Sequence, residues 1–196
     1  GTIRTGQPVT LTVDTEARNR TACNHTATHI LHAALRAILG DHVKQAGSLV
    51  SPDRLRFDFT HFSLVEPDDL ERIERYVNER IRINADVAIE EMEAEEAFRT
   101  GAMALFEEKY GDRVRVISLS DFSKELCGGT HTSRTGNIGA FKILSESSVA
   151  AGIRRIEAVT GEAAVIQMQQ AGRMLSEAAA LLKTRPEEII PRIEKM

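Results

Sequence analysis

The sequence predicts an α+β fold with a mostly antiparallel sheet, packed helices and a long helix near its C-terminal end. Several segments alternate apolar and polar residues as half-buried strands do, with turn residues between them. Other segments repeat apolar residues at helical spacing, and the composition becomes rich in Ala, Gln and Leu after Glu162. With 42% hydrophobic and 28% charged residues, the 196-residue chain has the composition of a globular domain with a real core.

The first predicted elements are a strand, a helix and a hairpin. Residues 8–14, PVTLTVD, alternate like a strand. Asn24 is a suitable N-cap for a helix that ends at Gly40, because Asn accepts hydrogen bonds from the first turn and Gly suits the C′ position. The segments QAGSLVS and RLRFDFT lie on either side of the turn SPDR and predict a β-hairpin with one buried face.

Helices and strands alternate in the rest of the chain. Pro67 fits the first turn of a long helix over residues 67–84, which has apolar residues at helical spacing beneath a charged face. DVAIEEM and DRVRVISL predict strands on either side of a short Glu-rich helix, and IGAFKILSESS and IRRIEAVT predict two more. A long helix over residues 162–183 and a short one that starts at Pro186 follow.

These elements divide the chain into three parts. We expect residues 1–20 to end a β-rich N-terminal subdomain, residues 21–161 to form the core domain and residues 162–196 to form a helical connector. Because the chain opens on Gly1 and a strand-like segment, we expect it to be a piece of a longer protein. No apolar run approaches the roughly 20 residues of a membrane helix, and no signal peptide is recognisable, so we expect no membrane partner and a cytoplasmic location.

Charge is distributed unevenly along the chain. The net charge of −4 argues against a uniformly basic nucleic-acid-binding protein, and we expect no DNA partner. Residues 109–160 nevertheless hold eight basic and five acidic residues. Lys142 and the pair Arg154 and Arg155 are candidate contacts for a phosphate group. Because neighbouring strand residues point to opposite faces, at most one of the two arginines can face a ligand, and the alternative is pairing with Glu146 or Glu157.

Three histidines lie in one short apolar segment, NHTATHILHAALR. At about 3.6 residues per turn, the spacing of His25, His29 and His32 places their imidazoles on one helical stripe. Apolar residues interleave with this stripe, so it lies against the core, where polar imidazoles need partners. The histidines are either metal ligands or unrelated core residues that donate hydrogen bonds to backbone carbonyls. Further metal-binding residue types elsewhere in the sequence would favour the first interpretation.

A second segment, SKELCGGTHTSRTGNIG, supplies a matching pair of ligands. Cys127 and His131 have the same four-residue separation as His25 and His29. Imidazole nitrogens and a thiolate are typical zinc ligands, so these residues predict one tetrahedral Zn²⁺ site beside a tight glycine loop. The alternative is a small buried Cys next to an ordinary turn. Cys23 is another candidate thiolate ligand. Because it precedes the histidine stripe and is badly oriented toward it, we do not expect Cys23 to bind the metal.

Motifs along most of the chain resemble the editing domain of the alanyl-tRNA synthetase family. In order they are NHTATHILHAALR, KQAGSLV, LRFDFTH, GAMALFEEKYGD, ELCGGTHTSRTGNIGAFKILSE and AAGIRRIEAVTG, within roughly residues 1–165. Threonyl-tRNA synthetase editing domains and free-standing alanyl-tRNA editing proteins share the two histidine-bearing motifs. GAMALFEEKYGD and the trailing helix look more like the full synthetase. One departure is Glu107, where the family usually has Gly before EKYG.

The resemblance implies an editing core over residues 21–161 that hydrolyses the ester of serine or glycine on alanine tRNA. A second site is needed because a pocket for a methyl side chain cannot exclude glycine by size and rejects an added hydroxyl only ~10²-fold. The family places Thr28 and Gln45 near the metal as substrate contacts. The alternative for Thr28 is a hydroxyl inside a helix that donates to a carbonyl of the preceding turn, and the alternative for Gln45 is an exposed strand residue. Backbone N–H groups of Gly129 and Thr130 are candidate oxyanion donors.

The resemblance also implies that the four zinc ligands are the catalytic centre. A site with four protein ligands is closed, which is typical of structural zinc, so catalysis requires one ligand to be released or the coordination to expand. His32 is expected to support the site or pack beside it. The alternatives are a structural zinc module and a tRNA-docking domain without hydrolysis. The expected partners are the acceptor end of alanine tRNA, whose phosphates Lys142, Arg154 or Arg155 would contact, and the rest of the synthetase, whose aminoacylation domain would bind ATP.

Overall fold

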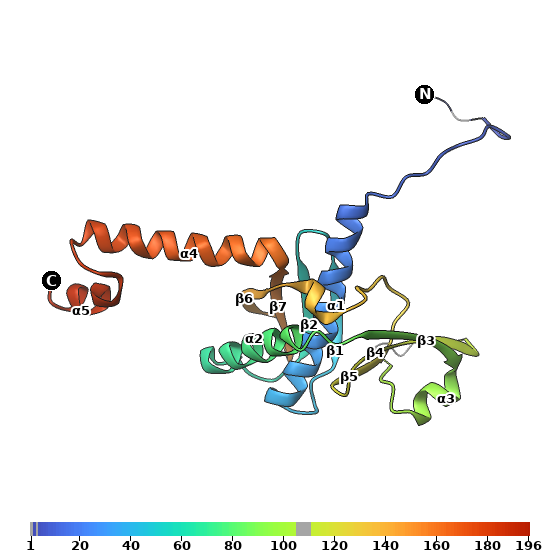
Figure 1. Cartoon of the computed structure of the whole chain (residues 1–196). Coiled ribbons are helices and arrows are strands. Elements are labelled where there is room, and N and C mark those ends of the chain that lie inside the picture. Colours follow the sequence, from blue (N-terminus) through green and yellow to red (C-terminus); the bar gives the residue numbers. More distant parts are fainter. Residues whose placement is uncertain (1, 3, 105–110) are drawn as a thin grey trace.

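The computed structural model describes residues 2, 4–104 and 111–196. It confirms the α+β class, with helices packed on antiparallel sheets and a long helix that leaves the core near the C-terminal end (Figure 1). The helical elements are α1 (Thr15–Leu39), α2 (Pro67–Arg82), α3 (Ala94–Arg99), η1 (Thr135–Ile138), α4 (Gly161–Leu181), η2 (Pro186–Glu188) and α5 (Ile189–Glu194). The strands are β1 (Gln45–Val50), β2 (Leu55–Thr60), β3 (Val87–Glu93), β4 (Arg113–Leu119), β5 (Ser123–Leu126), β6 (Phe141–Ala150) and β7 (Ile153–Thr160).

The larger sheet has four strands in the order β1-β2-β7-β6, all antiparallel. The predicted hairpin forms β1 and β2, and the hydroxyl of Ser51 accepts N–H groups of the turn between them. Phe57 and Phe59 of β2 are fully buried, and with Phe141 of β6 they are among the largest side chains of the main core. Helices α1 and α2 pack on this sheet and on each other, which buries their apolar faces.

The smaller sheet has three strands in the order β3-β4-β5 and lies beside the first. Strands β3 and β4 and the short α3 between them agree with the sequence prediction. Alternation along β4 buries Val114 and Val116 in a second, smaller core with Leu126 of β5. The sequence did not predict β5, because its four residues are too few for a clear alternation, nor the separation into two sheets.

Helix α1 begins ten residues earlier than predicted, at Thr15. The N-cap is Asp14, whose carboxylate accepts the N–H of Ala17 at 3.0 Å, and not Asn24. Asn24 is instead buried inside the helix, where its side-chain amide donates to the Ser51 carbonyl at 2.8 Å. The side-chain oxygen Oδ1 of Asn24 accepts a hydrogen bond from the hydroxyl of Thr160 at 2.7 Å. A residue type that favours caps therefore joins α1 to the hairpin turn and to the end of β7.

The strand predicted for residues 8–14 is not formed. This segment is irregular and exposed, and it extends away from the core ahead of α1 (Figure 1). The alternation of PVTLTVD has no neighbouring strand here, and a strand without a partner leaves its backbone groups unpaired. Glu107, the departure from the family pattern, lies outside the described residues.

The predicted C-terminal helices are confirmed as α4 and, after Pro186, as η2 and α5. Helix α4 starts directly at the end of β7 and projects from the core, with only Ala164 and Ala179 buried (Figure 1). Its role as a connector stays a prediction. Among the described residues, no helix has both the length and the apolar character needed to cross a membrane.

Replacement of Asn24 by Ala is expected to lower the free energy of unfolding by about 1–3 kcal/mol, because the partly buried Ser51 carbonyl and Thr160 hydroxyl lose their partner. Chemical denaturation monitored by circular dichroism measures the change. Asn19→Ala, at an exposed position of the same helix, is the matched control and should leave stability nearly unchanged. Equal stability of the two variants would contradict this role of Asn24.

Candidate metal centre and cleft

The two predicted ligand pairs come together in the structure. One ligand atom from each of His25, His29, Cys127 and His131 can be chosen so that all four lie within 4.8 Å of one another. The Cys127 Sγ lies 3.4 Å from the Nε2 of His25 and 3.4 Å from the Nε2 of His131. Cys23 lies outside this group, and its thiol donates to the Asn137 carbonyl. The structure therefore agrees with the choice of thiolate made from the sequence.

A glycine loop brings Cys127 to the helix. An added Cβ at Gly129 would overlap the imidazole of His25, whereas Gly128 has open space around it. Arg115 on β4 holds this loop, because its guanidinium donates to the carbonyls of Cys127 and Gly129. The Cys127 N–H in turn donates to the Arg115 carbonyl at 3.0 Å. The close approach of helix and loop thus depends on a position without a side chain and on a reciprocal link to β4.

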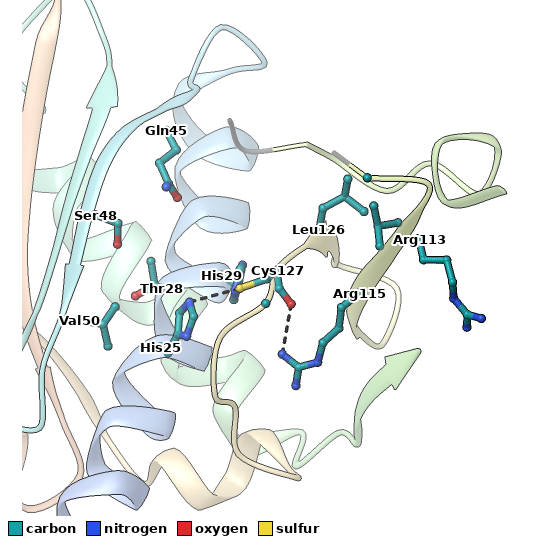
Figure 2. Close-up of a pocket in the computed structure, with 13 residues that line it drawn as sticks. His25, Thr28, His29, Gln45, Ser48, Val50, Arg113, Arg115, Leu126 and Cys127 are labelled. Carbon is teal, nitrogen blue, oxygen red and sulfur yellow. Dashed lines mark hydrogen bonds between the residues drawn. The ribbon is translucent and has the colours of Figure 1, made fainter. Parts of the chain in front are cut away.

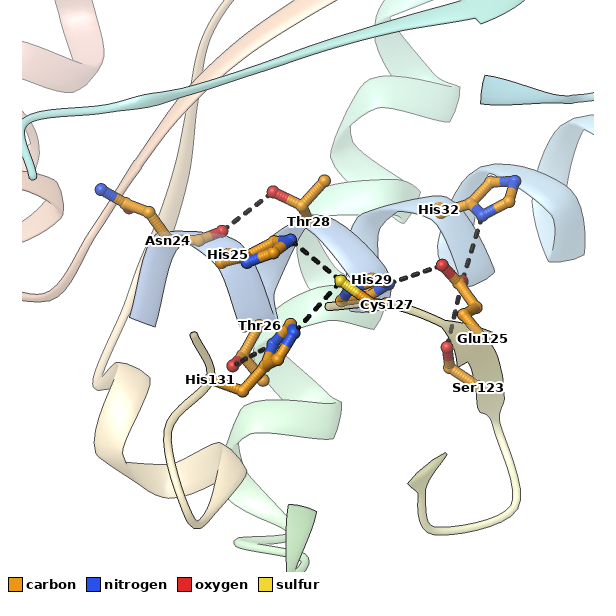
Figure 3. Close-up of polar contacts among 10 residues, drawn as sticks. All are labelled: Asn24, His25, Thr26, Thr28, His29, His32, Ser123, Glu125, Cys127 and His131. Carbon is orange, nitrogen blue, oxygen red and sulfur yellow. Dashed lines mark hydrogen bonds and ion pairs between the residues drawn. The ribbon is translucent and has the colours of Figure 1, made fainter. Parts of the chain in front are cut away.

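A buried carboxylate lies behind the cluster (Figure 3). Glu125, which is 1% exposed, accepts the Nδ1–H of His29 at 2.5 Å and that of His32 at 3.1 Å. The hydroxyl of Ser123 donates to the same carboxylate at 3.1 Å. His32 therefore supports the site through Glu125, which agrees with the role expected for it. Glu125 itself was not predicted, because a single Glu in a short strand gives no pattern in the sequence.

These contacts set the protonation of the site. Burial by itself raises the pKa of Glu125, but the charge of His29 and its hydrogen bond outweigh burial and lower this pKa to about 2. Burial also raises the pKa of the Cys127 thiol, and hydrogen bonds from His131 and His25 outweigh it and lower this pKa to about 3. Burial lowers the pKa of His29, whereas Glu125 raises it to about 10. Without a metal, His29 is therefore protonated beside two anions, and a bound metal ion would take the place of the proton on its Nε2.

The residues present fit a metal ion. The Nε2 of His29 is buried without a hydrogen-bond partner among the described residues, while its Nδ1 is fixed by Glu125. Such a carboxylate–histidine pair is the usual arrangement behind a metal-binding imidazole. Thr26 supports His131 in a similar way, because its oxygen lies 3.3 Å from the Nδ1 of that ring. Three imidazoles and one thiolate are a donor set that suits Zn²⁺.

A cleft of about 520 Å³ adjoins the cluster (Figure 2). One wall is α1 with His25, Thr28 and His29, and the edge strand β1 forms a second wall. Strand β4 and the beginning of the Cys127 loop form a third wall. The residues that line it are His25, Thr28, His29, Gln45, Ser48, Val50, Gly111, Arg113, Val114, Arg115, Leu126, Cys127 and Gly128.

The predicted substrate contacts fall partly in this cleft. Thr28 and Gln45 both line it, on separate walls. The hydroxyl of Thr28 donates to the Asn24 carbonyl at 2.9 Å, as in the alternative considered for it, and its lone pairs stay available to accept a hydrogen bond. Gly129 and Thr130 do not line the cleft. Sequence reasoning missed Ser48, Val50, Arg113 and Arg115, since strand residues of this kind have no distinctive motif.

Comparisons with known proteins relate this chain to tRNA synthetases. Residues 114–157, which include Cys127 and His131, match the family described as the threonyl and alanyl tRNA synthetase second additional domain. The whole chain is 60% identical to an alanine–tRNA ligase of Desulfosudis oleivorans and 56% identical to one of Halorhodospira halophila. Over its whole length, this chain is therefore similar to a part of these alanine–tRNA ligases. It spans only 22% and 23% of the length of these two relatives.

The three basic residues predicted to contact tRNA are each paired with a carboxylate. Arg154 makes two hydrogen bonds to Glu146, at 2.5 and 2.6 Å, which is the alternative considered for it. Arg155 makes two to Asp58, at 2.7 and 2.9 Å, on the other side of β7. Lys142 donates to Glu74 at 3.0 Å. A tRNA contact by these residues stays a prediction, and it would compete with an internal partner in each case.

Gly129→Ala is expected to lower the affinity for zinc at least ~10-fold, because the new methyl group displaces His25 from Cys127. Competition with a chromophoric chelator measures the affinity. Gly128→Ala is the matched control, since nothing lies near its Cβ, and it should bind zinc like the unchanged protein. If the two variants hold zinc equally well, the close approach at Gly129 does not determine the site.

Asp58→Asn is expected to destabilise the protein at pH 7 and to have less effect below about pH 4. The hydrogen bonds from Arg155 hold the pKa of Asp58 below its usual value, so its contribution is complete above the unfolded-state pKa of ~3.9. That contribution is lost as the pH falls through the lower folded-state pKa. Urea denaturation from pH 7 to pH 3 measures the difference, with Asp53→Asn in the exposed turn as control. A constant difference across this range would be the contrary result.

Proposed function

We propose that this chain is the editing domain of an alanyl-tRNA synthetase and hydrolyses the ester that links serine or glycine to the 3′ end of alanine tRNA. The observation that carries the proposal is the convergence of His25, His29, Cys127 and His131 beside a cleft. The match of residues 114–157 to the family and the similarity of the whole chain to a part of alanine–tRNA ligases support it. A cleft of about 520 Å³ has room for an aminoacyl ester and part of its ribose.

The four clustered residues would hold one Zn²⁺, and Glu125 would keep His29 in the tautomer that presents Nε2. When bound, zinc supplies Lewis-acid polarisation at the ester or at the attacking water. Cys127 already favours the thiolate that a metal requires, because its pKa is low. In the overall reaction water attacks the ester carbon, the bond to the ribose oxygen breaks, and the products are the free amino acid and a ribose hydroxyl.

Thr28 and Gln45 would distinguish serine from alanine. The hydroxyl of Thr28 already donates a hydrogen bond to the backbone carbonyl of Asn24. Toward the cleft, its oxygen can therefore only accept a hydrogen bond. A serine hydroxyl can donate to it, whereas alanine would leave the cleft's polar groups unpaired. A site built in this way can discriminate ~10⁴-fold or more, which an apolar pocket cannot achieve. The recognition of glycine does not follow from this contact, since glycine has no hydroxyl.

The proposed partners are the acceptor end of alanine tRNA and the remainder of a synthetase chain, and the proposed location is the cytoplasm, where protein synthesis takes place. The similarity to alanine–tRNA ligases supports these proposals. ATP binding would belong to other parts of such an enzyme. A structural zinc module and a tRNA-docking domain without hydrolysis are the alternatives that the experiment has to separate.

The test is deacylation of purified Ser-tRNA(Ala), Gly-tRNA(Ala) and Ala-tRNA(Ala) by the chain. We expect the first two to be hydrolysed and the third to be spared. Cys127→Ala should reduce the rate at least ~10²-fold, because the cluster loses its thiolate. Cys23→Ala is the matched control, since this second cysteine is half-buried but lies outside the cluster, and it should keep the activity.

Circular dichroism and metal analysis of the same variants separate the alternatives. Loss of activity in a folded Cys127→Ala protein supports a catalytic site. Unfolding together with loss of zinc supports the structural module. Binding of tRNA by the unchanged chain without any deacylation supports the docking domain, and full activity in Cys127→Ala would refute the catalytic role of the cluster.

A further inference from the structure

We infer that Arg113 and Arg115 of β4 bind the backbone phosphates of the RNA 3′ end whose terminal ester lies at the metal cluster. The inference rests on the proposed function for the position of the ester, and it adds the residues that would hold the RNA. It begins with the distribution of positive charge around the cleft. The residues predicted from the sequence to do this work, Lys142, Arg154 and Arg155, are not among those that line the cleft.

Those three cations are also neutralised within the fold. Arg154 and Arg155 make bidentate pairs with Glu146 and Asp58, and each of these carboxylates is largely buried. A phosphate would have to replace a partner that is already held in the geometry that a guanidinium prefers. The internal pairs therefore serve the packing of β7 more directly than they could serve RNA binding.

Arg113 and Arg115 have the opposite character. Both line the cleft, and no carboxylate lies within ion-pair distance of either of them among the described residues. They are two residues apart in one strand, so their side chains share one face of the sheet, on which Glu93 and Glu91 of β3 occupy the paired positions. Strand β4 thus places a short row of two guanidinium groups at the cleft wall, and within the described residues neither forms an ion pair with the paired carboxylates of β3.

The two side chains occupy different depths of the cleft wall. Arg115 is half-buried and reaches toward the Cys127 loop, whereas Arg113 is exposed and extends outward from the same strand (Figure 2). Arg115 uses one terminal nitrogen, Nη1, for the carbonyls of Cys127 and Gly129. A guanidinium has five N–H donors, so others stay available to a ligand. The row leads from the metal cluster toward the outside, the course that an RNA strand ending at the cluster must take.

The chemistry of the proposed ligand matches this row. The aminoacyl ester sits on the last ribose of a single strand, and phosphodiesters follow it at regular intervals. Arg binds phosphate through planar, charge-assisted hydrogen bonds, and such contacts position a nucleic acid without reading its bases. The overall charge of −4 does not oppose this, because the contact is local to the cleft. The cleft thereby combines ester chemistry at one end with phosphate binding along one wall.

The test measures binding of an uncharged RNA minihelix with the acceptor stem of alanine tRNA and a single-stranded CCA end. Arg113→Gln in the full 196-residue chain is expected to weaken binding about 5–10-fold. The slope of log affinity against log salt should fall by about 0.7, the value for one phosphate contact to a single strand. Arg113→Lys keeps the charge and should restore most of the affinity. Arg99→Gln, at an exposed position on α3, is the matched control and should bind normally.

A second RNA without the CCA end locates the contact. Arg113→Gln should not weaken binding of this truncated RNA further, because the phosphates that Arg113 contacts are missing from it. Arg115→Gln should add to the loss with the complete minihelix, and metal analysis shows whether its loop has kept zinc. If Arg113→Gln binds the complete minihelix as tightly as Arg99→Gln, or weakens both RNAs equally, the inference is wrong.

The binding experiment is independent of ester hydrolysis. A chain that fails to deacylate Ser-tRNA(Ala) but loses affinity on Arg113→Gln supports the RNA contact and contradicts the proposed activity. A chain that deacylates but binds RNA equally well with and without Arg113 supports the activity and contradicts the contact. Failure of one proposal is therefore distinguishable from failure of the other.

Discussion

The site depends on the contact between the middle of α1 and the segment from Glu125 to His131. Two interactions hold it: the buried carboxylate of Glu125 between His29 and His32, and the close approach of Gly129 to His25. The carboxylate accepts hydrogen bonds from two imidazoles that would otherwise be buried polar groups without partners. Breaking these hydrogen bonds would cost free energy, because no water is present to replace them. The glycine lets the backbone come near enough for Cys127 to join the cluster. Without this contact, the two ligand pairs would belong to separate parts of the fold.

The two sheets explain why the cluster lies beside a cleft and not inside a closed core. Helix α1 packs on the larger sheet, whereas Cys127 follows β5 of the smaller sheet. The four clustered residues therefore lie at the junction of the two layers, and the edge strand β1 faces β4 across the space between them. Residues from α1, β1 and β4 surround this space, so polar side chains from distant segments can act on one ligand. Pockets commonly form at such junctions.

Electrostatics divides the basic residues into two groups that the sequence does not distinguish. Lys142, Arg154 and Arg155 complete internal ion pairs and hold strands and helices together. Arg113 and Arg115 line the cleft, and in the described part of the chain neither forms an ion pair with a carboxylate. In sequence all five are basic residues in or near alternating strands. Only the presence or absence of a nearby carboxylate in the folded structure distinguishes a cation in an internal ion pair from one that can bind an anionic ligand.

The sequence by itself determined the class of the fold, the β1–β2 hairpin, most of the later elements and the four residues of the cluster. Local periodicity fixes these elements, and the equal spacing of His25–His29 and Cys127–His131 identifies a donor set for a metal. Tertiary structure decided the rest, because it depends on contacts between distant residues. Asn24 became a buried link and not a cap, and PVTLTVD found no partner strand. The positions of Glu125 and of the β4 arginines beside the cleft depend on the packing of β5 and the Cys127 loop against α1. A single Glu or Arg in a strand forms no sequence pattern from which its neighbours in space could be predicted.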